Sequence, residues 1–162
     1  RNALINRPKA LTSDSFSFIH VPFPADARGG SVTHRILVVD DDVSVRDLFQ
    51  TAFVDAAYEV VLAEGGEEAL DILQKQDINV IFLDLKLFGM NGIDLCRQIR
   101  KFKPVSLIYA MTGWSALYEI EECREAGFDD FFTKPVSLET IFKAVNDAFE
   151  KLNRWRIRSL IT

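Results

Sequence analysis

The residues of this chain best suited to chemistry share one position, at or just after the end of a short apolar run. The set comprises Asp40, Asp41, Asp42, Asp84, Thr112 and Lys134. Neighbouring carboxylates repel one another unless a cation joins them, and Mg²⁺ is held by one or two carboxylates while it keeps several waters. A further carboxylate can act as a nucleophile and become an acyl phosphate, while an ammonium group and a hydroxyl stabilise the charge on phosphoryl oxygens. The set therefore suits phosphoryl transfer with Mg²⁺ as cofactor.

The elements that must position these residues alternate regularly along the chain. Short runs rich in Val, Ile and Phe predict strands at 36–39, 58–63, 78–83, 105–111 and 128–132. Amphipathic segments predict helices at 43–56, 67–76, 93–101, 115–126 and 138–152. Parallel strands need a crossover of about a dozen residues, so this alternation predicts an α/β fold: a doubly wound, five-stranded parallel sheet with helices on both faces. Such sheets place their working residues at the carboxyl ends of the strands.

The chain divides into three predicted segments. Residues 1–33 contain several prolines and a Gly-Gly pair without a sustained period, and predict an N-terminal arm. Its apolar stretch 16–23 is expected to pack on a surface, and it offers a route to a homodimer. Residues 34–152 form the predicted α/β domain, and 153–162 a basic tail or the start of a linker.

Charge and composition narrow the classes of function. The 162 residues carry a net charge of −5 and are 48% hydrophobic, enough for a folded core. The net charge is +2 over residues 1–34, −11 over 35–150 and +4 over 151–162. We therefore expect no direct nucleic-acid binding in this chain and, without an apolar run of about 18–20 residues, no membrane span. Two cysteines, Cys96 and Cys123, are too few for a disulfide framework and favour a cytoplasmic location.

Four stretches of the sequence, 36–42, 81–87, 110–113 and 131–135, resemble the receiver domain of two-component response regulators. The resemblance covers roughly residues 34–152. It implies a flavodoxin-like sheet order of 2-1-3-4-5, for which CheY-like receiver domains are themselves a standard example. It also implies a phosphorylation-dependent switch whose partners are a histidine kinase or phosphotransfer protein and a downstream protein or output domain. The chain would catalyse its own phosphorylation and dephosphorylation without being a turnover enzyme.

The resemblance also implies roles for individual residues. Asp84 matches the aspartate that accepts the phosphoryl group. Asp40 and Asp41 match the acidic pair that holds Mg²⁺ together with Asp84, and the backbone carbonyl of Lys86 would be a further ligand.

Three more positions match the switching parts of the family. Thr112 matches the hydroxyl that moves toward the phosphoryl group, and Lys134 the lysine that contacts it. Phe131 lies where an aromatic side chain changes rotamer on activation. Pro135 matches a proline often preceded by a cis peptide.

The sequence departs from the family at several positions. Phe88 stands where proline is common, which predicts a more mobile loop, and Asn91 where aspartate is frequent. Lys86 and Trp114 would border the path of hydrolytic water, and an indole there predicts slow dephosphorylation.

Two alternatives to a phosphoacceptor switch remain to be weighed. A haloacid-dehalogenase-like phosphatase would use Asp40 and Asp42 as its aspartate pair, with the acidic pair Asp129-Asp130 as a further group. That pair precedes Lys134 instead of following it, and Asp84 would have no role. A receiver-like module that no longer switches is disfavoured by the complete acidic set.

Other reactive residues have simpler interpretations. Asp42 is expected to cap the helix that follows it. Cys96 and Cys123 are expected to pack in the interior, and neither His20 nor His34 lies in a phosphotransfer helix.

Overall fold

The computed structural model describes residues 34–53, 58–113 and 117–159. Within them, five strands alternate with five helices. The strands are β1 (His34–Val39), β2 (Tyr58–Ala63), β3 (Val80–Asp84), β4 (Leu107–Thr112) and β5 (Asp130–Thr133). The helices are α1 (Val43–Ala52), α2 (Gly66–Lys75), α3 (Gly92–Phe102), α4 (Leu117–Ala126) and α5 (Leu138–Ser159). The predicted arm, residues 1–33, lies outside the described residues.

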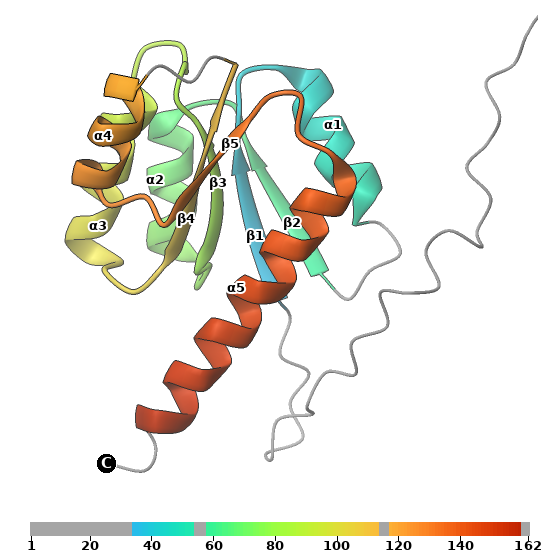
Figure 1. Cartoon of the computed structure of the whole chain (residues 1–162), viewed down its shortest axis with the longest axis vertical. Helices are drawn as coiled ribbons and strands as arrows, with labels where there is room; N and C mark the ends of the chain where they lie inside the picture. Colours follow the sequence, from blue (N-terminus) through green and yellow to red (C-terminus); the bar gives the residue numbers. More distant parts are fainter. Residues whose placement is uncertain (1–33, 54–57, 114–116, 160–162) are drawn as a thin grey trace, which may run out of the picture. The chain divides into compact units, whose positions relative to one another are not determined.

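All strands are parallel and form one sheet in the order β2-β1-β3-β4-β5, which confirms the predicted fold class (Figure 1). After β1 the chain first adds β2 on one side and then crosses to add β3 on the other. The carboxyl ends of β1 and β3 therefore flank the point where the strand order reverses, which is where ligands bind in open α/β sheets.

Two helical layers cover the sheet, because side chains alternate along each strand. Leu37, Val39, Ile81 and Leu83 face the layer of α2, α3 and α4. Ile36, Val38, Val80 and Phe82 face the layer of α1 and α5 (Figure 1). The central strands are apolar on both faces, as expected of strands buried in a parallel sheet.

The last helix extends beyond its predicted end. The apolar stripe that packs on the sheet stops at Leu152, where the prediction placed the end of the helix, yet α5 continues to Ser159. Arg154 pairs with Glu150 at 3.8 Å one turn back, and the Lys151 ammonium lies 5.0 Å from the Trp155 ring centroid. Residues 153–159 therefore belong to α5, and the role of this segment as a basic tail or the start of a linker stays a prediction. Among the described residues, no helix is both long enough and apolar enough to span a bilayer.

Candidate functional site

The sheet brings the predicted site residues together at the carboxyl ends of its strands. Strand β1 ends at Val39, which is in register with Leu83, so Asp40 and Asp84 follow on neighbouring strands. Thr112 ends β4 and is in register with Thr133 of β5, and the Lys134 amide donates to the Thr112 carbonyl at 2.7 Å. Four strand ends thus meet at one rim, as the sequence predicted.

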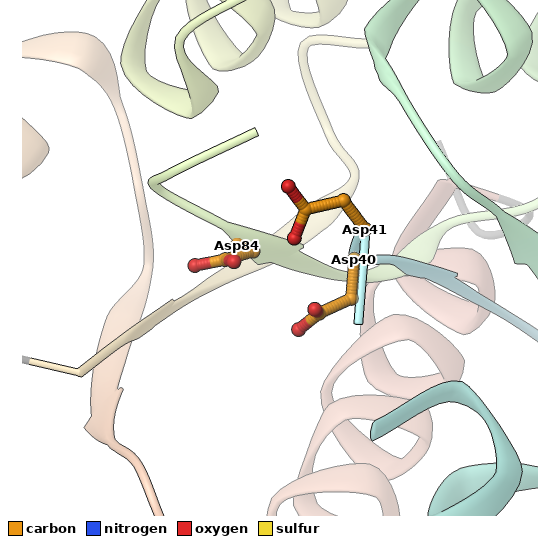
Figure 2. Close-up of side chains that lie close together, drawn as sticks. All are labelled: Asp40, Asp41 and Asp84. Carbon is orange, nitrogen blue, oxygen red and sulfur yellow. The ribbon is translucent and has the colours of Figure 1, made fainter. Parts of the chain in front are cut away.

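Three carboxylates meet where the strand order reverses, between the carboxyl ends of β1 and β3. Asp40 and Asp41 extend from the end of β1 toward Asp84 at the end of β3 (Figure 2). One oxygen from each carboxylate lies within 4.8 Å of the others. Asp40 is fully buried and Asp84 is 5% exposed, whereas Asp41 is exposed. Hard oxygen donors, one of them open to solvent, fit a small divalent cation such as Mg²⁺ that keeps part of its water shell.

Lys134 lies between two of these carboxylates. Its Nζ is 2.7 Å from Asp40 Oδ2 and 3.0 Å from Asp84 Oδ2. Burial raises the pKa of the Asp40 carboxyl, although hydrogen bonds from Lys134 and from the Asp42 amide oppose that shift. Burial alone would lower the pKa of Lys134, but its contacts with Asp40 and Asp84 outweigh burial and raise it. Lys134 therefore stays protonated between the two aspartates.

Backbone and side-chain contacts hold Asp40 in place. The Asp42 amide donates to Asp40 Oδ1 at 3.0 Å. Arg46 Nη1 donates to the Asp40 carbonyl at 2.7 Å, and its Nη2 donates to Glu64 Oε1 at 2.7 Å. Arg46 thereby connects the end of β1 to the loop after β2. The sequence pattern did not single out this residue, because an arginine in an amphipathic helix usually points to solvent.

The loop after β3 is also tied down. The Leu85 amide donates to the Met111 carbonyl at 3.0 Å, and the Lys86 amide donates to Asp84 Oδ1 at 3.2 Å. The backbone at Gly92 lies so close to the Asp84 carbonyl that a Cβ there would collide with it. A glycine is therefore required at the start of α3. The role predicted for the Lys86 carbonyl as a metal ligand stays a prediction.

Thr112 and Phe131 border one small cavity beside the acidic cluster. Thr112 is 2% exposed and Phe131 is half-buried. The remaining lining residues are Leu85, Glu119, Ile120 and Cys123. The cavity lies between the sheet and α4 and is too small for a water molecule, so the rotamer change predicted for Phe131 would require its lining to move. The peptide bond before Pro135 is cis, as the resemblance implied.

The geometry gives no support to the phosphatase alternative. Asp42 is the N-cap of α1, accepts from the Ser44 amide at 2.8 Å, and is exposed. Asp129 accepts from Arg100 at 2.8 Å and from the Ile108 amide at 2.9 Å, at the opposite edge of the sheet. The paired groups that a dehalogenase-like mechanism needs are therefore engaged in structural contacts. The capping role expected of Asp42 is confirmed.

The remaining reactive residues are packed or lie outside the described part. Cys96 and Cys123 are buried, as expected. The ring of His34 packs edge-on against Phe149 with centroids 4.5 Å apart. Trp114, on which slow dephosphorylation was predicted, falls outside the described residues, as does His20.

Known proteins show where this arrangement recurs. The family model of the response regulator receiver domain matches residues 36–146. The uncharacterized transcriptional regulatory protein YrkP of Bacillus subtilis is 35% identical over 114 residues, covering 70% of this chain and 48% of YrkP. Sporulation initiation phosphotransferase F of the same organism is 32% identical over 114 residues, covering 70% of this chain and 92% of that protein.

A solved structure agrees with these relatives. The receiver domain of the Saccharomyces cerevisiae response regulator Ssk1, crystallised with the histidine phosphotransfer signaling protein Ypd1, superposes with a TM-score of 0.67 at 25% identity. That match covers 72% of this chain and 88% of the Ssk1 chain. The chain spans about half or less of the length of several transcriptional regulators that it matches. By its family match, its sheet order and its relatives, this chain belongs to the response regulator receiver domains, which are signalling domains and not turnover enzymes.

Proposed function

We propose that Asp84 accepts a phosphoryl group from a phosphohistidine on a kinase or phosphotransfer protein, and that the modified domain then presents a changed surface to a partner. The observation that carries this proposal is the position of Lys134, which contacts both Asp40 and Asp84 in a cluster of three carboxylates. A structural ion pair would need one carboxylate. Three carboxylates beside one lysine leave an excess of negative charge that a divalent cation would balance.

The transfer step follows from the chemistry of the two side chains. A carboxylate oxygen of Asp84 attacks phosphorus as the bond from phosphorus to the imidazole nitrogen breaks, forming an acyl phosphate. The imidazole leaves with the bonding electron pair and regains a proton from water. Mg²⁺, when bound, would neutralise charge on the phosphoryl oxygens. Asp41, Asp84 and the Lys86 carbonyl would hold it, with Asp40 in support.

Phosphorylation changes the charge that Thr112 and Lys134 face. Lys134 already contacts Asp84 at 3.0 Å and would contact the new phosphoryl oxygens instead. Thr112 lies at the neighbouring strand end and would donate its hydroxyl to the same group. Movement of Thr112 would open space in the cavity beside Phe131 and let that ring repack. The surface of α4, β5 and α5 would then change, which is a local charge event that biases a two-state element.

The partners and context follow from the same chemistry. Receiver domains interact with histidine kinases or phosphotransfer proteins, and Ypd1 is such a partner for Ssk1. We infer a cytoplasmic histidine-kinase pathway for this chain, with a downstream protein or an output domain as its target. Dimerisation through the arm stays a prediction.

Labelling with a small phosphodonor tests the proposal. Acetyl phosphate with Mg²⁺ should label the chain stoichiometrically, and Asp84→Asn should abolish the label because an amide is a poor nucleophile. Asp47→Asn, a matched change at an exposed aspartate of α1, should label normally. Intact-protein mass spectrometry measures the added mass. Persistent labelling of Asp84→Asn would refute the assignment. Hydrolysis of many phosphodonor molecules per chain, abolished by Asp40→Asn, would instead support the phosphatase interpretation.

A further inference from the structure

Arg46 is a largely covered arginine in the first turn of α1. Only 11% of its side chain is exposed, whereas the side chain of its ion-pair partner Glu64 is 75% exposed. An ion pair with so exposed a carboxylate contributes little to stability. Covering a guanidinium also costs side-chain freedom and hydration. The ion pair by itself therefore gives no reason for the burial of Arg46.

The second contact of Arg46 lies at the acidic cluster. Arg46 Nη1 donates to the Asp40 carbonyl at 2.7 Å, six residues back along the chain. Side chains of a helix lean toward its N-terminus, so the side chain of Arg46 lies over the entrance to α1. The carbonyl that it binds belongs to the peptide unit that joins Asp40 to Asp41. The guanidinium therefore fixes the orientation of that peptide unit.

Asp41 depends on this contact for its position. Its side chain is exposed and extends from the end of β1 toward Asp84 (Figure 2). The peptide unit before Asp41 is held at its carbonyl by Arg46. The unit after it is held at the Asp42 amide, which donates to Asp40 Oδ1 at 3.0 Å. Of these two contacts, that of Arg46 is the one that ties the backbone of Asp41 to a helix.

The charge of Arg46 separates two possible effects on a cation site. A positive charge near three carboxylates repels a divalent cation, so charge alone would make an arginine unfavourable there. Glu64 Oε1 lies 2.7 Å from the guanidinium and offsets that charge. The pair thus offers hydrogen-bond donors to the Asp40 carbonyl with little net charge. This combination suits a residue that positions metal ligands.

We propose that Arg46 is a positioning residue that holds the peptide between Asp40 and Asp41, so that the Asp41 carboxylate is presented to a divalent cation. Glu64 acts by orienting Arg46. The inference rests on the proposed function, because it concerns the metal site of the same cluster. Removing a group that orients metal ligands typically weakens metal binding about 10–100-fold. Arg46 does not touch the reacting atoms, so it acts on how tightly the cation binds and not on the transfer step.

Binding of Mn²⁺ to the full chain tests the proposal. This ion takes the same hard oxygen ligands as Mg²⁺, and electron paramagnetic resonance measures its free form. Arg46→Met keeps the aliphatic stem but removes the donors and the charge. It should weaken Mn²⁺ binding about tenfold, whereas loss of the positive charge alone would tighten it.

Labelling by acetyl phosphate gives a second measurement on the same variant. The Mg²⁺ concentration at which Arg46→Met is labelled at half its maximal rate should rise about tenfold. The rate at saturating Mg²⁺ should fall by less than about threefold, because Arg46 acts on cation binding.

Arg97→Met is the matched control. Arg97 is 48% exposed and its ion pair with Asp94 stays within α3, so this substitution removes one positive charge without touching the loop after β1. Its Mn²⁺ affinity should stay within about twofold of that of the original chain, because exposed charges are screened.

Glu64 supplies an independent test at an exposed position, where substitution should leave the fold intact. Glu64→Ala should weaken Mn²⁺ binding about threefold, and Glu67→Ala, which removes the same charge at an exposed position of α2, by less than about twofold. Adding Glu64→Ala to Arg46→Met should change nothing further, because Glu64 acts through Arg46.

Two results would overturn the inference. One is Mn²⁺ binding by Arg46→Met that is unchanged or tighter, with its fold verified by circular dichroism. The other is equal weakening by Glu64→Ala and Glu67→Ala, which would show an effect of charge alone. An original chain that neither binds Mn²⁺ nor is labelled by acetyl phosphate would instead refute the proposed function itself.

Discussion

The ammonium group of Lys134 contacts two carboxylates of the site. It lies 2.7 Å from Asp40 and 3.0 Å from Asp84, and only 22% of its side chain is exposed. Asp40 is fully buried, so its carboxylate depends on such a contact to remain charged. Removing Lys134 would leave the cluster with three carboxylates and take away a donor for the transferring phosphoryl group.

We expect Lys134→Ala to slow labelling of Asp84 by acetyl phosphate roughly 10²-fold, the usual loss when one donor to developing charge is removed. Pseudo-first-order rates from mass spectrometry at saturating Mg²⁺ measure the effect. Lys103→Ala is the matched control, because that lysine is also mostly covered but pairs with Asp77 on the far side of the domain. A Lys134→Ala rate equal to that of the control would contradict the role.

Site residues that end an apolar run could be predicted from the sequence. Residues whose role depends on tertiary contacts could not. Asp84 and Thr112 could be located because each closes a buried strand, and Lys134 because it directly follows the short apolar run of β5. Arg46 could not, because its spacing matches that of a solvated helix residue and its two partners lie just after β1 and just after β2.

At the level of elements, Arg100 of α3 joins its helix to two loops. Its guanidinium donates to the Gly127 carbonyl at 2.8 and 2.6 Å, to the Ser106 carbonyl at 2.5 Å, and to Asp129 at 2.8 Å. These acceptors lie before β4, after α4 and before β5. One planar side chain therefore joins α3 to two connections, α3–β4 and α4–β5, at the amino ends of the strands.

We expect Arg100→Ala to lower the free energy of unfolding by about 2–4 kcal/mol, because several carbonyls and the Asp129 carboxylate lose their donor. Arg100→Lys should recover little, since an ammonium cannot reproduce the fork of donors. Urea unfolding followed by circular dichroism gives the values.

Arg97→Ala is the control on the same helix. Arg97 pairs with Asp94 at 2.9 Å with both side chains about half exposed, and exposed pairs of this kind contribute about 0–1 kcal/mol. A loss for Arg100→Ala no larger than for Arg97→Ala would show that the network contributes nothing.

Several strands and helix α5 begin or end at residues other than those that the apolar pattern predicted. The predicted starts of β3 and β5 are each two residues early, because Ile78 and Phe128 pack in the core without belonging to a strand. The predicted start of β4 is also two residues early, but Val105 there is exposed. Apolar runs indicate burial, whereas a strand is defined by its ladder of hydrogen bonds. Helix α5 differs in the opposite direction. It outlasts its apolar face because the residues after Leu152 favour helix, and Arg156 and Arg158 lie favourably near its carboxyl end.

Across the whole domain, both helical layers bury weak acids against the sheet. Cys96 is fully buried on the side of α2, α3 and α4, and donates to the Ala126 carbonyl at 3.5 Å. Tyr109 is 8% exposed on the side of α1 and α5. Burial raises the pKa of the Cys96 thiol to about 11 and raises that of Tyr109 as well. Both faces of the sheet therefore favour the neutral acids.

Stability should consequently fall in alkaline solution. A folded-state pKa above the unfolded value means that the stabilisation is fully present below the unfolded pKa, which is 9.0 for a thiol, and is lost as the pH rises through about 11. For Cys96 the loss at pH 11 is about 2 kcal/mol. Urea unfolding of the original chain and of Cys96→Ala at pH 8 and pH 11 isolates this thiol, because every other titration is common to both proteins. The stability advantage of the original chain over Cys96→Ala should shrink by that amount between the two pH values. An advantage that stays constant would mean that the thiol ionises as easily in the folded domain as in the unfolded chain, and that the layer over α3 does not exclude water from it.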